Sequence, residues 1–125
     1  MERMRAAVVQ LIEEGYTRFI TGMALGADTW FAECVLDLKD VYPDIELEAA
    51  VPYIGQSDKI LAACAEVTYV SNAYSKYCMN KRNKYMVDKS DVVLVVNYAD
   101  AGGTVNTRAY AEKKKKRIID LTRPQ

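Results

Sequence analysis

An unbroken apolar run from Val92 to Val96 constrains the fold of this chain more than any other feature. A strand that is covered on both faces reads as a continuous apolar run, whereas a half-exposed strand alternates. A Gly102-Gly103-Thr104 turn and a helical segment that reaches about Lys116 follow the run. This order is typical of a parallel α/β sheet that holds a ligand at the carboxyl ends of its strands. We therefore expect residues 91–97 to form a central, buried strand.

Predicted strands and helices alternate along the rest of the chain. The spacing of apolar residues predicts helices over about 3–14, 28–38, 78–89 and 104–116, and a short helical piece over 58–65. Strands are expected at 18–21, 46–52, 67–70, 91–97 and 118–121. The pattern predicts an α/β, Rossmann-like, doubly wound and mostly parallel sheet with helices on both faces. With 125 residues the chain fits one domain over 1–125.

The charge balance argues against several classes of partner. Seventeen acidic and seventeen basic residues cancel, so we expect no global field that attracts nucleic acid or an anionic membrane. The basic run Lys113–Arg117 is interpreted as a solvated helix end. No apolar run approaches the roughly 20 residues of a membrane-spanning helix. The first residues, with Glu2, Arg3 and Arg5, are amphipathic rather than leader-like, so we expect a cytoplasmic protein.

The chain contains no histidine, which removes the usual general base and the Ser-His and Cys-His nucleophile pairs. Its three cysteines, Cys34, Cys64 and Cys78, are widely spaced and form no CxxC pair. Reduced structural thiols are the simplest interpretation, and we expect no metal and no cofactor.

Three groups of residues suit an anionic ligand. The first is the loop that contains Gly22, Met23, Ala24, Gly26 and Asp28. Its glycines allow a tight turn and close approach of the backbone, and the helix that starts near Asp28 directs free amides to the same place. Asp28 serves equally well as the N-cap of that helix.

The second group is Gly102, Gly103 and Thr104 with Thr107 one turn later. The two threonines are three residues apart, so both hydroxyls fall on one side of the first helical turn and can join the backbone amides around an anion. The alternative is an ordinary glycine turn with Thr104 as the N-cap.

The third group is Arg82 and Asn83 in the helix before the central strand. Asn83 lies on the apolar stripe of that helix, so its amide requires a polar neighbour. Arg82 offers a planar fork of donors to a phosphate or carboxylate. Its alternative role is a surface ion pair with Asp88 or Glu66. Asp88 and Asp91 are interpreted as a helix end and a strand start rather than as a catalytic pair.

At these residues the chain resembles the SLOG superfamily, which joins the Smf/DprA DNA-processing proteins with the LOG (Lonely Guy) phosphoribohydrolases. Residues 21–28 are similar to the SGxAxGxD loop of the Smf/DprA branch, residues 82–96 to its RN helix and apolar strand, and residues 102–111 to its turn before a TAxxA helix. The GMALGxDxWxAE and RNxYMVDxSD patterns are most similar to those of YpsA-like bacterial proteins of unknown function. The resemblance implies a Rossmann-like fold and a pocket for a nucleotide-like ligand, formed by the two glycine loops and the RN helix.

The chain also departs from these relatives. LOG hydrolases carry PGGxGTxxE, in which the glutamate assists glycosidic cleavage, whereas here Val105, Asn106 and Thr107 follow Gly103-Thr104. We therefore lean toward a protein without this catalysis. Relatives place a strand and a Gly-His-Arg-Pro-like loop before the first helix, and they have a longer helical excursion where Lys59 meets Ile60. We expect the single domain to lack that first strand and part of the 59/60 region.

Three functions remain open at this point. The first is a non-catalytic module that binds a nucleotide or nucleotide-derived phosphorylated ligand, with a homodimer as a further expectation because superfamily members often dimerise. The second is hydrolysis of a nucleoside monophosphate N-glycoside, with Asp28 or Glu33 in the role of the missing glutamate. The third is single-stranded DNA binding in the Smf/DprA manner, against which the balanced charge argues.

Overall fold

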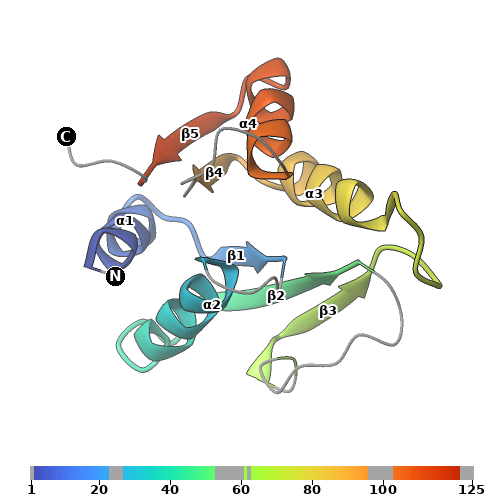
Figure 1. Ribbon diagram of the computed structural model, residues 1–125. Coiled ribbons are helices and arrows are strands. Elements are labelled where there is room, and N and C mark those ends of the chain that lie inside the picture. Colours follow the sequence, from blue (N-terminus) through green and yellow to red (C-terminus); the bar gives the residue numbers. More distant parts are fainter. Residues whose placement is uncertain (1, 23–26, 53–60, 62, 96–102, 122–125) are drawn as a thin grey trace.

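The computed structural model describes residues 2–22, 27–52, 61, 63–95 and 103–121, and only the backbone of residues 2, 27, 28 and 103–105 (Figure 1). Its four helices are α1 (Glu2–Glu13), α2 (Ala27–Leu38), α3 (Cys78–Lys89) and α4 (Gly103–Lys113). Its five strands are β1 (Arg18–Thr21), β2 (Glu46–Val51), β3 (Glu66–Tyr69), β4 (Val92–Val95) and β5 (Arg117–Asp120).

All described strand pairs are parallel. One sheet has the order β1-β2-β3, with Phe19 beside Leu47 and Ala49 beside Val67. A second sheet pairs β4 with β5, with Val93 beside Ile118. Helices between parallel strands confirm the predicted α/β, Rossmann-like class. Within the described ranges no ladder joins β1 to β4, so the single sheet that we expected is seen as two.

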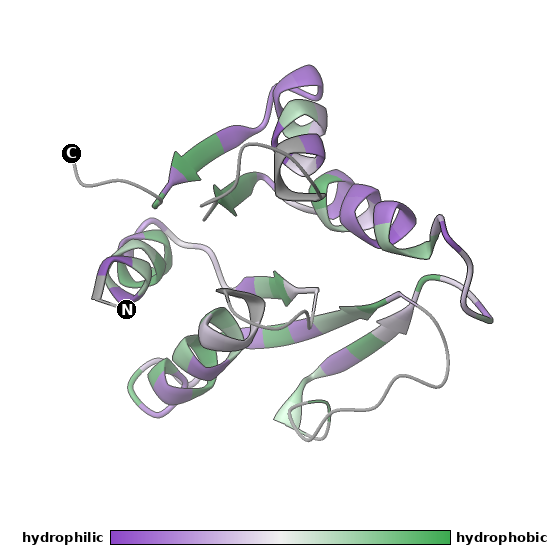
Figure 2. Ribbon diagram, viewed as in Figure 1, coloured by the Kyte–Doolittle hydropathy of each residue, from purple (hydrophilic) through white to green (hydrophobic). Residues whose placement is uncertain are grey.

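The side chains of β2 alternate between two faces, and a different helix covers each face. Leu47 belongs to the core cluster that α1 and α2 build with β1, together with Val8, Val35 and Leu38. Glu48 points to the opposite face, where it meets Tyr85 of α3. The same core takes in partly buried side chains of β4 and β5, so one apolar interior spans both sheets. Figure 2 shows that α3 is largely hydrophilic, and its Lys81 and Lys84 are exposed.

The expectation of full burial for the apolar strand is wrong in its described part. Val92, Val93 and Leu94 of β4 are only partly buried, and Val95 alone is fully buried. The physical reason is that β4 pairs on one side only among the described residues, with β5. A strand with one neighbour keeps one edge accessible, whatever its composition.

Most predicted boundaries agree with the observed ones. The bounds of β1 and α3 are those predicted, and the other described elements begin or end within about three residues of expectation. Asp28 follows the start of α2 instead of preceding it as an N-cap would, because the helix already begins at Ala27. The predicted helical piece at 58–65 and the suspected gap at 59/60 fall mainly or wholly outside the described residues.

Two helices end in the same way. Gly15 (φ 107°) and Lys115 (φ 59°) both take left-handed conformations just after α1 and α4. In each case the next amide bonds five residues back, from Tyr16 to Leu11 and from Lys116 to Ala111, both at 3.0 Å. This is the Schellman arrangement, in which glycine is favoured because it has no Cβ. Lys115 therefore carries a local backbone cost that Gly15 avoids.

We predict opposite effects of substitution at these two positions. Gly15→Ala should lower the free energy of unfolding by about 1 kcal/mol, since the left-handed region is unfavourable for a residue with a Cβ. Lys115→Gly should leave it unchanged or raise it. Urea unfolding of both variants tests this, and a comparable loss at Lys115→Gly would contradict it.

Candidate functional site

Arg82 joins α3 to the first glycine loop. Its side chain is 7% exposed, and its Nη1 donates to the carbonyl oxygen of Gly22, the buried residue that follows β1. Its Nε donates to Oδ1 of Asn83 at 2.7 Å. The two sequence groups that contained Gly22 and Arg82 are thus in direct contact. The predicted contact of Arg82 with a ligand phosphate stays a prediction.

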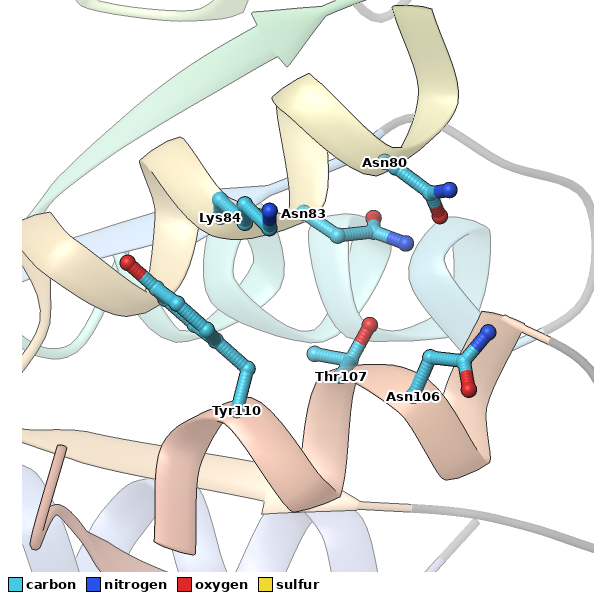
Figure 3. Close-up of a pocket in the computed structure, with 6 residues that line it drawn as sticks. All are labelled: Asn80, Asn83, Lys84, Asn106, Thr107 and Tyr110. Atoms are coloured by element: carbon cyan, nitrogen blue, oxygen red, sulfur yellow. The ribbon is translucent and has the colours of Figure 1, made fainter. Parts of the chain in front are cut away.

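Asn83 and Thr107, from two of the predicted groups, line one pocket between α3 and α4 (Figure 3). The pocket has a volume of about 150 Å³. Asn83 is half-buried, and the polar neighbour that its position required is the Arg82 guanidinium. The full lining consists of Asn80, Asn83, Lys84, Asn106, Thr107 and Tyr110.

Tyr110 forms one end of the pocket and is held in place by three groups. Its hydroxyl donates to Oδ1 of Asp88 at 2.8 Å, and this bond raises the pKa of Tyr110. The ammonium groups of Lys84 and Lys114 lie 5.7 and 5.5 Å from its ring centroid, within cation–π range. Asp88 therefore orients Tyr110. This role was not predicted from the sequence.

The remaining predicted site residues fall into two sets. Met23, Ala24, Gly26 and Gly102 lie outside the described residues. Asp28, Gly103 and Thr104 are described by their backbone alone, in the first turns of α2 and α4. Glu33, the alternative catalytic group, is exposed on α2 and is not among the residues that line the pocket.

A buried carboxylate anchors α3 one turn after Arg82. Glu48 of β2 is 1% exposed and accepts hydrogen bonds from Tyr85 (2.5 Å), from Thr68 of β3 (3.0 Å) and from Arg18 of β1 (3.2 and 3.3 Å). Arg18 also pairs with Glu46 and Glu66, but all three of these side chains are at least 44% exposed, so these pairs contribute little.

The pKa of Glu48 reflects this environment. Burial alone would raise the pKa, because it disfavours the charged form. Hydrogen bonds from Tyr85, Thr68 and Arg18 outweigh that effect and hold the pKa of Glu48 below its ordinary value. Burial and the bond to Glu48 raise the pKa of Tyr85. Glu48 is therefore an ionised acceptor at neutral pH.

Acidic and basic residues are concentrated in different segments of the chain, although their numbers are equal over its whole length. Residues 1–75 contain five Lys and Arg against twelve Asp and Glu, a formal charge of −7. Residues 76–117 contain eleven Lys and Arg against four Asp and Glu, a formal charge of +7. The second segment includes α3 and α4, which pack against each other, so the pocket lies in the basic half. Comparing the two halves would have revealed this from sequence alone.

The YpsA family model, described as the YspA SLOG family, matches residues 1–122. The chain belongs to the YspA SLOG family. Within the described residues, the RN helix of this SLOG chain is α3, and Gly103 and Thr104 of its Gly-Gly-Thr motif begin α4. The predicted family is thus confirmed.

Relatives of this SLOG protein come from several bacteria. It is 32% identical to an uncharacterised SPbeta prophage-derived protein, YoqJ, of Bacillus subtilis, over 90% of this chain and 80% of YoqJ. It is 31% identical to a UPF0398 protein of Halalkalibacterium halodurans, over 88% of this chain, and 24% identical to one of Brevibacillus brevis, over 74%. The matches span 64% and 56% of those two relatives, less than two thirds of their length. None of the described helices is long and apolar enough to cross a membrane.

Arg82→Met should destabilise this SLOG fold by about 1–3 kcal/mol, because it leaves the Gly22 carbonyl and the Asn83 amide without their donor. Arg82→Lys should recover only part of the loss, since a single ammonium cannot reproduce the two directions of a guanidinium. Urea unfolding measures both variants. Full stability of Arg82→Met would show that the link is not structural.

The Glu48 network predicts a pH dependence of stability. Its folded pKa lies below the unfolded value of ~4.3, so its contribution is present above that pH and is lost as the pH falls through the folded pKa. At pH 7, Glu48→Gln should lower the free energy of unfolding by about 1–3 kcal/mol. The difference in stability between the variant and the wild type should become smaller as the pH falls below about 4. Thermal melts of both proteins from pH 7 to pH 3 test this, and a difference that does not change with pH would contradict it.

Proposed function

We propose that this protein binds a nucleotide or nucleotide-derived phosphorylated ligand in the α3–α4 pocket and acts as a sensor or binding module. The observation that carries the proposal is the meeting of three separate sequence groups. Asn83 and Thr107 line one pocket, and Arg82 ties the Gly22 end of the first loop to the same helix. A few convergent polar groups in a hollow of the surface are typical of a ligand site.

The lining favours a polar ligand with negative charge. Lys84 supplies a cation, and Asn106 and Thr107 lie near the N-terminal end of α4. The helix dipole favours negative charge near that end. The pocket thus combines a cation, a nearby helix start and several neutral hydrogen-bonding groups.

The charge separation supports the same class of ligand. All residues that line the pocket belong to the +7 segment, while the three strands of the β1-β2-β3 sheet belong to the −7 segment. A basic half raises the local concentration of anions and speeds their association, in a manner that salt weakens. A phosphorylated small molecule suits such a field.

The two other functions receive less support. Among the described residues that line the pocket there is no Asp or Glu, and N-glycoside hydrolysis of the LOG type uses a glutamate. For single-stranded DNA, the separated charges remove the objection from zero net charge, but a small pocket such as this one suits one nucleotide better than a strand. A short oligonucleotide therefore belongs in the binding test as a competitor.

The test is a panel of nucleotides, nucleotide sugars and ADP-ribose derivatives against the whole protein, by thermal shift and calorimetry. A true ligand at about 100 times its Kd should stabilise the fold by about 2.7 kcal/mol. Absence of binding throughout the panel at millimolar concentration would refute the proposal. Chromatography of the same mixtures would reveal a released base and thus hydrolysis.

Lys84→Ala should weaken the binding of a ligand found in this panel by about tenfold. This corresponds to a loss of about 1.4 kcal/mol in binding free energy for one charged contact. Lys81→Ala is the matched control, because Lys81 is exposed on the same helix and does not line the pocket. Equal losses in the two variants would indicate a diffuse field rather than this pocket.

A further inference from the structure

The amide-rich lining of the α3–α4 pocket carries more information than the presence of a site. Three of its six residues are asparagines: Asn80 and Asn83 on α3, and Asn106 on α4. In Figure 3 their amide groups and the Thr107 hydroxyl are directed into the space between the two helices. Asn80 and Asn106 are exposed on their helices, so the apolar core does not explain their presence there.

This set of groups does not suit a phosphate alone. A phosphate offers acceptors only, and its usual protein partners are arginine, lysine and backbone amides. An asparagine presents a donor and an acceptor side by side. That pair matches a nucleobase edge, as in the two-bond contact of asparagine with N6 and N7 of adenine.

A hydrogen bond fixes the orientation of the Asn83 amide, so this residue presents a defined group to the ligand. Its Oδ1 accepts from Arg82 Nε at 2.7 Å, which leaves the Nδ2 donor for the pocket (Figure 3). Because Arg82 is buried and also bonds to Gly22, this orientation is braced by the sheet. Asn83 is therefore a preorganised donor for an acceptor atom on the ligand.

Tyr110 places an aromatic side chain beside the asparagines of the pocket. Its ring is positioned by Asp88 through the hydroxyl and by Lys84 and Lys114 over the ring. Aromatic rings support nucleobases through contact with the ring system, whatever the sequence. The pocket thus offers hydrogen-bonding groups and an aromatic side chain within one enclosure.

We propose that the α3–α4 pocket receives the base of the ligand, and that Asn80, Asn83 and Asn106 read its hydrogen-bonding edge. This assignment rests on the proposed function and deepens it. The phosphate then lies beyond the three asparagines, within reach of Lys84. A ligand without a base should lose most of its affinity, even when its phosphate and ribose are intact.

The experiment compares AMP, GMP, CMP and UMP with ribose 5-phosphate on the whole protein by calorimetry. We expect at least one mononucleotide to bind ten times more tightly than ribose 5-phosphate. Asn80→Ala and Asn106→Ala should each weaken the binding of that mononucleotide at least threefold and leave the affinity for ribose 5-phosphate unchanged. Asn72→Ala is the control, because Asn72 is an exposed asparagine that does not line the pocket.

Asn83→Asp provides the sharper variant, because the carboxylate still accepts from Arg82 while the donor to the pocket is removed. It should weaken the binding of the preferred mononucleotide at least tenfold. The change in affinity for ribose 5-phosphate, which has no base, measures the part of the loss that is due to the added charge. Equal binding of all mononucleotides and ribose 5-phosphate, unaffected by these variants, would overturn the base assignment and leave the proposed function standing. No binding of any nucleotide in the wider panel would overturn both.

Discussion

The structure depends on how α3 is fastened to the three-stranded sheet. Near its middle Arg82 bonds to the end of β1, and one turn later Tyr85 bonds to the buried Glu48 of β2. These residues are three apart, so they lie on one side of the helix. The other side of α3 packs against α4, which covers the second sheet. Because no ladder joins the two sheets among the described residues, α3 and the shared apolar core connect them.

This fastening determines the quality of the site. A side chain on a well-anchored helix keeps its position, and a pocket with fixed groups loses less entropy when it binds a ligand. Asn83 is the clearest case, because the residue beside it is buried and holds its amide. The pocket thus lies on the outer side of α3, whose inner side is held to the sheet by hydrogen bonds.

The sequence predicted the elements well, and the contacts of α3 less well. Local signals such as apolar spacing are sufficient for α3 and β1, and motif patterns were sufficient for the family. The role of Glu48 was not foreseen, because Glu46 and Glu48 alternate with Leu47 and resemble a solvated strand face. Only the long-range packing of α3 turns that face into an interior. The same holds for Arg82, whose burial follows from the position of Gly22 rather than from its neighbours in the chain.

The candidate site was predicted in part for a similar reason. Asn83 and Thr107 were selected from local patterns, and the pocket contains both. Asn80, Asn106 and Tyr110 were missed, since each is unremarkable by itself and gains meaning only from the crossing of two helices. The separated charges were present in the sequence but were hidden by a total of zero. A comparison by segment, rather than over the whole chain, carries that information.

The two sides of α3 have a consequence for how such proteins diverge. Residues that fasten the helix, Arg82 and Tyr85, are different from those that face the pocket, Asn80 and Lys84. Under the proposed function, exchanges at the latter positions would alter what is recognised without disturbing the scaffold. Lineages that share this architecture would then acquire new specificities through a handful of surface replacements, while their cores stay the same.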